Sequence, residues 1–260
     1  MTSVKQAFDL SGKTALITGG SRGLGLQMAE ALGEQGAHIV LSSRKADELE
    51  KARQHLSAMD IKSDWIAADG QKAEDVERLA RDAISKTGRI DILVNNAGAT
   101  WGAPTTEHSL EAWDKLMNLN VRSVFYLSQQ IGKLSMIPNG GGMILNITSI
   151  AGLRGNHPGS IATLAYNASK AAVVNMTRAL ASEWGQYGIN VNALAPGYFL
   201  SDMTKGVIES VGLEKMTADV PLRRIGDGDD LKGAALLFCS PAGKHITGQI
   251  LAVDGGIMAM

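Results

Sequence analysis

Short apolar segments alternate with longer amphipathic segments along the chain, and this alternation constrains the fold more than any other feature. The short segments are rich in branched side chains, which predicts β-strands over 13–18, 37–43, 63–68, 90–96, 142–149, 189–197 and 249–256. The longer segments predict helices over 22–36, 46–59, 73–88, 110–135 and 165–187. Such alternation is typical of an α/β fold, a doubly wound parallel sheet of about seven strands with helices on both faces.

Length and charge restrict the classes of protein to which this chain can belong. At 260 residues it can bury one large core, and no proline-rich or charged linker interrupts it, so a single domain over residues 1–260 is expected. The region 198–228 departs from the strand–helix rhythm, which makes it a candidate substrate loop. Lysine and arginine total 25 against 26 aspartates and glutamates, and this near balance argues against a nucleic-acid partner.

The sequence carries no signal for export or for membrane insertion. The stretch MTSVKQAFDLSGK lacks the apolar core of a signal peptide, and no apolar run approaches the ~20 residues that cross a bilayer. The single cysteine, Cys239, lies in the apolar run AALLFCS, which favours a buried small side chain over a disulfide or a metal ligand. A soluble cytoplasmic protein without a metal site is therefore expected.

A glycine-rich turn joins the first predicted strand to the first predicted helix. Its pattern is T-G-x-x-x-G-x-G from Thr18 to Gly25, which is neither G-x-G-x-x-G nor a P-loop. Glycines let the backbone turn sharply, and the helix that follows offers free N–H groups and a positive dipole end to an anion. A turn without a ligand remains an alternative for the motif alone, but its place after the first strand favours a dinucleotide phosphate. The candidate residues are Gly19, Ser21, Arg22, Gly23, Leu24 and Gly25.

The end of the second predicted strand distinguishes between the two nicotinamide cofactors. An acidic residue there would bind the ribose 2′-hydroxyl of NAD, whereas arginine would bind the 2′-phosphate of NADP. The chain reads VLSSRK, with Ser43 and Arg44 at the tip, and Arg22 of the glycine turn within reach of the same phosphate. Guanidinium groups bind phosphate bidentately, so this set favours NADP(H), although an ordinary solvated basic turn has the same composition.

A tyrosine and a lysine share one face at the start of the helix predicted over 165–187. The segment LAYNASKAAVVNM places Tyr166 four residues before Lys170, and residues four apart lie one above the other on a helix. Spacing alone is compatible with a tyrosine packed on the core beside a solvated lysine. The remaining motifs decide between this interpretation and a functional pair.

Together these segments resemble the short-chain dehydrogenase/reductase family in its single-domain form, from about Ser11 to Gly256. The matching motifs, in chain order, are TGGSRGLG (18–25), NNAG (95–98), NVRS (120–123), NITS (146–149), YNASK (166–170), APG (195–197) and VDGG (253–256). The resemblance implies a Rossmann-type fold, a nicotinamide cofactor and an enzyme that interconverts a ketone and a secondary alcohol. It further implies a homo-oligomer, a homotetramer or a homodimer.

The resemblance implies that Tyr166 is the general acid/base that exchanges a proton with the substrate oxygen. Lowering the pKa of a tyrosine from ~10 to ~7 requires ~4 kcal/mol. One ammonium at ~4 Å in an effective dielectric constant of ~20 supplies that amount. Lys170 is expected to lie farther from the hydroxyl, so the oxidised nicotinamide and a serine hydrogen bond must contribute the rest.

The resemblance assigns roles to three further side chains. Lys170 would bind the nicotinamide ribose, Ser149 would hold and polarise the substrate oxygen, and Asn120 would anchor a water that links Lys170 to solvent. Cofactor contacts of lower specificity are also implied: Asp69 and Gly70 at the adenine, Asn96, Ala97 and Gly98 along the adenosine ribose, and Pro196, Gly197, Phe199 and Ser201 at the nicotinamide.

The spacing between Ser149 and Tyr166 departs from the family pattern. The two residues are 17 positions apart, a few more than usual, and the extra residues fall in the loop 155–165. This loop is expected to shape the substrate pocket, and His157 within it is a candidate substrate contact, although a solvated loop histidine is the more ordinary interpretation. The longer gap leaves Thr148 and Ser160 as alternatives to Ser149.

The substrate class stays open at this point. The pattern resembles 3-oxoacyl-thioester reductases and gluconate 5-dehydrogenase-like enzymes about equally. The polar residues Asn156, His157 and Ser160 would suit a hydroxylated substrate, whereas the apolar part of 198–216 would suit an acyl or aromatic one. A non-catalytic NADP(H)-binding sensor or scaffold is the alternative, but all four expected catalytic side chains are present. A dehydratase or epimerase usually has a larger C-terminal domain than this length allows.

Overall fold

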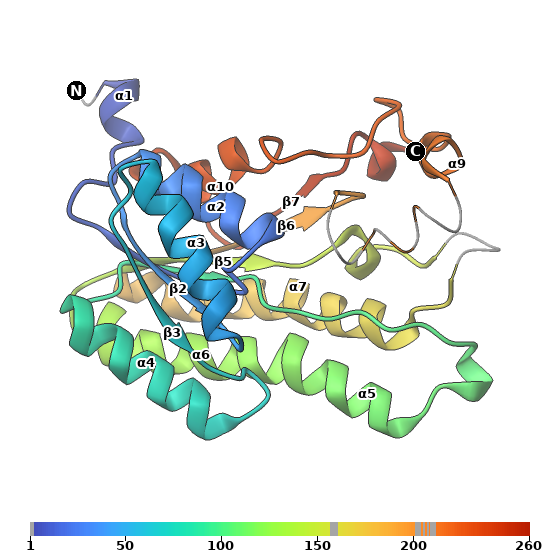
Figure 1. The fold of residues 1–260 in the computed structure, drawn as a ribbon, viewed down its shortest axis with the longest axis horizontal. Helices are drawn as coiled ribbons and strands as arrows, with labels where there is room; N and C mark the ends of the chain where they lie inside the picture. The colour runs from blue at the N-terminus through green and yellow to red at the C-terminus, as the bar shows by residue number, and fades with distance from the viewer. Residues whose placement is uncertain (1–2, 157–160, 201–203, 205, 207, 209–211) are drawn as a thin grey trace.

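A seven-stranded parallel sheet forms the centre of the molecule (Figure 1). The structure is a computed structural model, and it describes residues 3–156, 161–200, 204, 206, 208 and 212–260. The strands are β1 (Thr14–Thr18), β2 (His38–Ser43), β3 (Ser63–Ala67), β4 (Ile92–Asn95), β5 (Gly142–Ile147), β6 (Ile189–Pro196) and β7 (Ile250–Val253).

The strand order is β3-β2-β1-β4-β5-β6-β7, so the sheet grows outward in both directions from the β1–β4 pair. The direction of winding reverses between these two strands, and in open parallel sheets ligands bind beside the carboxyl ends of the strands at such a point. The register aligns Leu16 with Leu93, which brings the end of β1 level with the end of β4. The glycine turn and the NNAG motif therefore meet at this edge.

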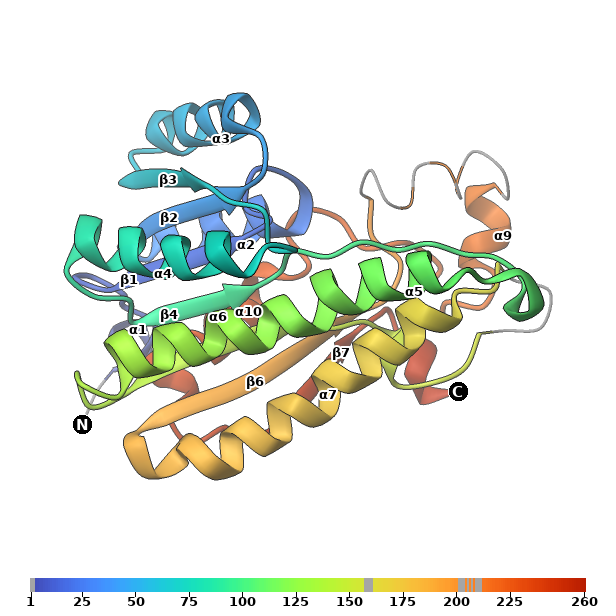
Figure 2. The ribbon, with the colours of Figure 1, turned by 90° about the horizontal axis from the view of Figure 1, so that it is seen from below.

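Helices cover both faces of the sheet, as Figures 1 and 2 show from two directions. One face carries α2 (Gly23–Glu34), α3 (Ala46–Ala58) and α10 (Lys232–Phe238). The other carries α4 (Ala73–Thr87), α6 (Ser123–Ile131) and α7 (Leu164–Trp184), with α5 (Leu110–Met117) continuing the line of α6 beside α7. Two short helices, α1 (Val4–Ala7) and α9 (Leu213–Thr217), lie outside these layers. Among the described helices, none is both long and apolar enough to span a membrane.

The core consists of two apolar layers separated by the sheet. Alternate strand residues point to opposite faces, so Ile17 packs among α2, α3 and α10 while its neighbour Leu16 packs on the side of α4, α6 and α7. Because helices cover both faces, the strands are mostly apolar, with a few polar residues such as Asn146 and Asn192, and the prediction of an α/β doubly wound sheet is confirmed. Cys239 is fully buried in the first layer, as expected, and burial raises the pKa of its thiol.

The helix predicted over 110–135 has a more complex form. Between α5 and α6 the chain widens into a π-helical turn, η2 (Asn118–Arg122), and a second π-helical turn, η3 (Gly132–Met136), follows α6. Such turns interrupt the regular i→i−4 hydrogen bonds and occur frequently at functional sites. In η2 the widening coincides with Asn120, whose side chain bonds to backbone and side-chain groups outside its own helix.

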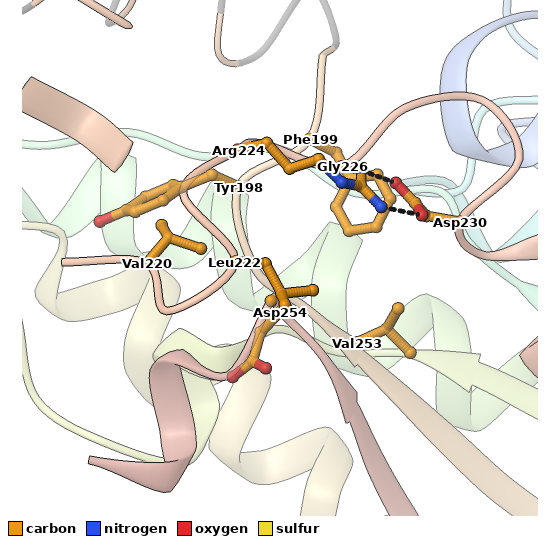
Figure 3. A pocket seen from close by; sticks show the side chains of 10 residues that line it. Tyr198, Phe199, Val220, Leu222, Arg224, Gly226, Asp230, Val253 and Asp254 are labelled. Carbon is orange, nitrogen blue, oxygen red and sulfur yellow. Dashed lines mark hydrogen bonds and ion pairs between the residues drawn. The ribbon is translucent and has the colours of Figure 1, made fainter. Parts of the chain in front are cut away.

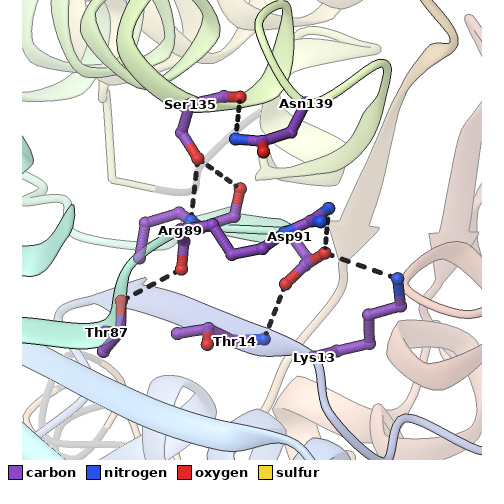
Figure 4. A network of polar contacts seen from close by, with 8 residues as sticks. Lys13, Thr14, Thr87, Arg89, Asp91, Ser135 and Asn139 are labelled. Atoms are coloured by element: carbon purple, nitrogen blue, oxygen red, sulfur yellow. Dashed lines mark hydrogen bonds and ion pairs between the residues drawn. The ribbon is translucent and has the colours of Figure 1, made fainter.

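A polar network closes the edge of the sheet opposite the glycine turn (Figure 4). The buried carboxylate of Asp91 accepts the backbone N–H of Thr14 at 3.0 Å and pairs with Lys13 at 3.4 Å and with Arg89. One residue earlier, the Ser135 hydroxyl accepts the N–H of Ile90 at 2.8 Å and donates to its carbonyl at 3.1 Å. Asp91 thus ties the start of β1 to the segment that enters β4.

Replacing Asp91 with alanine is expected to destabilise the protein by about 2 kcal/mol. The substitution leaves the buried N–H of Thr14 without its acceptor, and an unsatisfied buried donor costs roughly 1–3 kcal/mol. The pairs with Lys13 and Arg89 add little, because both cations are about 40% exposed. Urea unfolding measures the change, with Asp82→Ala as the control, since Asp82 is half-exposed and pairs with the exposed Arg78 on the surface of α4. Equal losses in the two variants would contradict the role given to Asp91.

Candidate active site

Four polar side chains from three separate segments meet beyond the carboxyl ends of β4 and β5. Asn120 comes from η2, Ser149 stands two residues after β5, and Tyr166 and Lys170 come from the first turns of α7. The sheet and α7 fix these segments relative to one another through the backbone of β5, because Lys170 Nζ donates to the Ile147 carbonyl at 2.8 Å. The structure thus brings together the four residues for which the sequence predicts catalytic roles.

Tyr166 is a half-buried side chain that lies beside Ser149. Burial raises the pKa of the Tyr166 hydroxyl, and a side-chain hydrogen bond with Ser149 opposes that shift, so in this structure the pKa moves in the opposite direction to the lowering expected from the sequence. The Ser149 oxygen accepts the N–H of Ala151 at 3.2 Å, which leaves the hydroxyl proton of Ser149 free to be donated. A substrate oxygen that approaches this pair would meet two hydroxyl groups, as carbonyl reduction requires.

Lys170 is a buried amine beneath the Tyr166 ring. Its Nζ lies 5.7 Å from the centroid of that ring, and burial lowers its pKa to about 8. This distance is to the ring and not to the phenol oxygen, so the expected separation of Lys170 from the hydroxyl stays a prediction. The group is therefore poised to gain or lose a proton close to physiological pH.

Asn120 clamps the chain that follows the NNAG motif. Its Oδ1 accepts the N–H of Ala99 and its Nδ2 donates to the Ala99 carbonyl, both at 2.9 Å. The same Nδ2 donates to Ser169 Oγ at 3.0 Å, and this hydroxyl donates to the Tyr166 carbonyl at 2.8 Å. A Cβ added to Gly98 would lie 3.3 Å from Asn120 Oδ1 and 3.4 Å from Lys170 Nζ. Gly98 therefore keeps open a space that both groups border.

The alternatives to Ser149 are not equally placed. Thr148 is buried, and its hydroxyl donates to the Lys170 carbonyl at 2.8 Å, so it fixes the first turns of α7 instead of facing a substrate. Ser160 and His157 lie outside the described residues. Of the candidates that the structure describes, Ser149 is the one whose hydroxyl reaches Tyr166.

Asn156 joins the two sides of the long loop before α7. Its Nδ2 donates to the Ile161 carbonyl and to Thr163 Oγ1, both at 2.9 Å. Its Oδ1 accepts Nδ2 of Asn167, also at 2.9 Å, and Thr163 Oγ1 donates to Asn167 Oδ1 at 2.7 Å. The amide of Asn156 is thus engaged within the loop, and its expected contact with a hydroxylated substrate stays a prediction.

The glycine turn has the backbone form that the sequence predicts. Gly19 and Gly23 adopt positive φ angles of 64° and 53°, where a side chain would be strained. A Cβ on Gly25 would lie 2.3 Å from the Gly19 carbonyl oxygen, so this position admits only glycine. Helix α2 begins at Gly23 without a side-chain cap on its first N–H groups, which leaves them available to an anion. Ser21 is half-buried in the turn, and Leu24 packs against the core.

The NNAG motif stabilises the glycine turn through hydrogen bonds to its first residues. The amide of Asn96 donates to the carbonyls of Thr18 and Gly19 at 3.0 and 3.1 Å. Thr18 Oγ1 in turn accepts the backbone N–H groups of Asn96 and Ala97, both at 3.1 Å. The side chain of Asn96 therefore braces the glycine turn, and Thr18 is a supporting residue that the sequence analysis did not identify. The sequence feature that could have indicated this role is the threonine at the start of the T-G-x-x-x-G-x-G pattern.

The tip of β2 fits a phosphate group. Ser43 Oγ is buried and has no hydrogen-bond partner among the described residues, which is unusual for a buried hydroxyl. Arg44, the next residue, is exposed. Arg22 of the glycine turn lies near the start of α3, with its Nη1 at 3.5 Å from Glu48 Oε1. A hydroxyl without a partner, followed in the chain by an exposed arginine, suits the adenosine 2′-phosphate of NADP(H).

The turn after β3 is fixed by its own hydrogen bonds. The N–H of Asp69 donates to Asp75 Oδ2 at 2.8 Å, and Asp69 Oδ1 accepts the N–H of Gln71 at 3.1 Å. A Cβ on Gly70 would lie 3.3 Å from the side chain of Leu119, so the turn packs closely on η2. The structure therefore places Asp69 and Gly70 at the same edge as the glycine turn.

The residues expected at the nicotinamide follow β6. A Cβ on Gly197 would lie 2.8 Å from the Cα of Asp254, so Pro196 and Gly197 pack tightly on the VDGG motif. The ring of Phe199 is buried against Gly226, and a cofactor contact from this residue would have to come from its backbone. Ser201 lies outside the described residues.

A small cavity of about 100 Å³ lies at the base of the region 198–228 (Figure 3). Phe199 and Val253 line it, and Arg224 closes one end through a two-fold pairing with Asp230, in which Nη2 lies 2.7 Å from Oδ1. Ligand pockets usually measure roughly 300–1,000 Å³. This cavity is therefore better understood as a packing gap behind the predicted substrate loop than as the substrate site.

Comparisons with known proteins agree with this geometry. The family model described as enoyl-(acyl carrier protein) reductase matches residues 19–258. The chain is 40% identical over 255 residues to gluconate 5-dehydrogenase of Gluconobacter oxydans, covering 96% of each protein. It is 34% identical over 246 residues to the 3-oxoacyl-[acyl-carrier-protein] reductase FabG of Staphylococcus epidermidis, covering 94% of this chain and 98% of the relative.

A solved structure extends the likeness to three dimensions. The crystal structure of a gluconate 5-dehydrogenase from Burkholderia cenocepacia, in complex with NADP and tartrate, matches with a TM-score of 0.93 and 32% identity. The match covers 99% of this chain and 100% of that one. The family model, the full-length relatives and the shared fold lead to one conclusion: the chain belongs to the short-chain dehydrogenase/reductase family and is an oxidoreductase of the alcohol–carbonyl type.

Proposed function

We propose that this protein is an NADP(H)-dependent oxidoreductase that interconverts a ketone and a secondary alcohol, with Tyr166 as the general acid/base. The observation that carries the proposal is the hydrogen-bonded pair of hydroxyls on the half-buried side chains of Tyr166 and Ser149, with the buried Lys170 amine beneath the phenol ring. The nicotinamide, when bound, would supply or accept the hydride. The protein would supply the proton and position the oxygen that receives it.

In the direction of reduction, Tyr166 donates its proton to the carbonyl oxygen. The raised pKa of this phenol keeps it protonated at neutral pH, which is the form that a general acid needs for the reduction of a ketone. Ser149 donates a hydrogen bond to the same oxygen and stabilises the negative charge that develops there. In the direction of oxidation Tyr166 must first pass its own proton to Lys170, and the resulting phenolate oxygen then accepts the proton of the alcohol.

Lys170 and Asn120 complete the proposed path for the proton. The Lys170 amine, with a pKa of about 8, would restore the proton to Tyr166 and hold the nicotinamide ribose. Asn120 holds the backbone of Ala99 and, together with Lys170, borders the space above Gly98. A water in this space would connect the amine to solvent.

For the cofactor, the residues at the tip of β2 and in the glycine turn support NADP(H). Arg22, Ser43 and Arg44 would hold the 2′-phosphate, while the N–H groups at the start of α2 would hold the pyrophosphate. Asp69 and Gly70 would lie at the adenine, Ala97 and Gly98 along the ribose, and the backbone from Pro196 to Phe199 at the nicotinamide. Structures of relatives at 32–35% identity hold NADP, which supports the same choice.

Replacing Arg44 with alanine is expected to weaken NADPH binding about tenfold or more, since a charge-assisted hydrogen bond contributes roughly 1.5–3 kcal/mol. NADH binding should change less than twofold, because NADH has no 2′-phosphate. Titrations followed by nicotinamide fluorescence measure both constants. Arg53→Ala is the control, because Arg53 pairs with Glu50 on the same helix. An equal loss of affinity for both cofactors would show that Arg44 does not bind the 2′-phosphate.

The substrate is proposed to be a ketone or a secondary alcohol of the hydroxy-acid or 3-oxoacyl type. The relative at 40% identity favours the first class, and FabG at 34% supports the second. Exposed Trp101 and Ile161 add apolar surface near the site, where Gly102 packs against the segment before α7. A panel of sugar acids, polyols and 3-oxoacyl thioesters, assayed with NADPH and NADP⁺ as appropriate, would distinguish the classes.

A non-catalytic NADP(H)-binding sensor is the competing function. It would need the fold and the cofactor site but not the alignment of Tyr166, Ser149 and Lys170. The internal hydrogen bonds that hold this alignment favour an enzyme. Cofactor binding without turnover of any substrate in the panel would favour the sensor.

We further propose a homotetramer or a homodimer. Phe125 on α6 and Leu134 on the following η3 are 46% and 39% exposed, which is high for large apolar side chains on one helical segment. A two-fold axis that pairs these helices would bury both residues in one interface. Light scattering on the purified protein measures the mass of the assembly, and a monomer would contradict the proposal.

A further inference from the structure

Glu48 is an acidic side chain that contacts two cations, Arg22, which is assigned above to the 2′-phosphate, and Lys45, which follows Arg44 in the chain. It belongs to the first turn of α3, five residues after Ser43. Its Oε1 lies 2.8 Å from Lys45 Nζ and 3.5 Å from Arg22 Nη1. One carboxylate oxygen therefore contacts both Lys45, the N-cap residue of α3, and Arg22 of the glycine turn.

The carboxylate is less accessible than the cations that it contacts. The side chain of Glu48 is 25% exposed, whereas those of Arg22 and Lys45 are 61% and 62% exposed. A hydrogen bond from Lys45 lowers the pKa of Glu48, burial opposes this shift, and the charge of Arg22 adds to it. Glu48 is thus an anion at neutral pH, and its position is fixed by the helix.

A bound 2′-phosphate would compete with this carboxylate. Guanidinium and ammonium donors that point to Glu48 are not available to a second anion in the same geometry. The phosphate is also repelled by the carboxylate at short range, since like charges a few ångströms apart raise the free energy of the complex. NAD(H) carries an uncharged hydroxyl at this position and meets neither cost.

We propose that Glu48 is a specificity-determining residue that reduces the preference of this protein for NADP(H) over NAD(H). It does so by pairing with Arg22 and Lys45 in the cofactor-free protein and by opposing the phosphate in the complex. This inference rests on the proposed function, because it needs a 2′-phosphate site at the tip of β2. It differs from that proposal in assigning a residue that weakens phosphate binding.

The substitution Glu48→Gln tests the proposal, because it removes the charge and keeps the shape of the side chain. NADPH is expected to bind about fivefold more tightly, while the dissociation constant of NADH changes less than twofold. Adenosine 2′,5′-bisphosphate and AMP, titrated by calorimetry, should reproduce the difference without the nicotinamide. These binding constants do not depend on the identity of the substrate.

Asp47→Asn is the matched control. It removes one negative charge from the same helical turn, and no described contact joins Asp47 to Arg22 or Lys45. If Asp47→Asn strengthens NADPH binding as much as Glu48→Gln does, the loss of one negative charge explains both effects. The specific role proposed for Glu48 would then be wrong. If Glu48→Gln leaves NADPH binding unchanged or weakens it, the carboxylate orients the cations and the inference is overturned.

The wild-type protein separates this inference from the proposed function. If it binds NADPH more tightly than NADH, the phosphate site stands and the variants decide the role of Glu48. If it binds neither cofactor, the proposed function fails and the inference fails with it.

Discussion

Tyr166→Phe is expected to lower kcat for ketone reduction by about a thousandfold or more, while the dissociation constant of NADPH changes less than twofold. The phenol oxygen is the proposed proton donor, and a positioned general acid contributes roughly 10²–10⁴ in rate. Phenylalanine keeps the ring that packs above Lys170, so the fold and the cofactor site should be preserved. Single-turnover absorbance of NADPH measures the chemical step, and nicotinamide fluorescence measures binding.

Tyr187→Phe provides the matched control for this experiment. Tyr187 lies just beyond the other end of α7, in the short helix η5 (Gly185–Tyr187), and is 41% exposed. Its hydroxyl should not affect either constant. An unchanged rate in Tyr166→Phe would remove Tyr166 from the mechanism, and a parallel loss of NADPH affinity would make its role structural.

Lys170→Met is expected to change how stability depends on pH, in addition to lowering turnover. Burial lowers the pKa of Lys170 to about 8, from an ordinary value of 10.5 in the unfolded chain. Between these two values the unfolded state binds more protons than the folded state, so the folded protein gains stability as the pH rises. Below pH 8 the amine is charged in both states, and its contribution no longer changes with pH.

The size of this effect follows from the shift. A difference of about 2.5 pKa units corresponds to about 3 kcal/mol, which wild type should gain relative to Lys170→Met between pH 8 and pH 10.5. Urea unfolding of both proteins at several pH values measures this difference, and the subtraction removes groups that titrate in both. Lys51→Met, at an exposed position of α3, should run parallel to wild type. A constant difference between wild type and Lys170→Met would contradict the burial of a titrating amine.

The sheet could be predicted from the sequence because its signal is local. Each strand is a short apolar run, and β7 is the one that the prediction extended most, to 249–256 instead of Ile250–Val253. The chain turns earlier there because the carboxylate of Asp254 accepts the N–H groups of Gly256 and Met258. Such a turn depends on one side chain and leaves the apolar pattern unchanged.

The π-helical turn η2 could not be predicted, because its cause is distant in the sequence. Asn120 bonds to Ala99 and Ser169, which are 21 and 49 positions away. The same holds for Glu48, whose contact with Arg22 joins a helix to a turn that precedes it by a whole strand. Motifs located the proposed catalytic side chains, whereas the residues that hold or oppose them are visible only in three dimensions.

Asn156 has a consequence for how this protein could acquire new specificities. Its amide bonds to Ile161, Thr163 and Asn167, so the two flanks of residues 157–160 are joined independently of the sequence between them. An insertion or a grafted peptide at 157–160 would thus be insulated from the register of α7 and from Tyr166. Natural variation or a designed library could therefore change the sequence of 157–160 while the residues proposed to transfer the proton are kept.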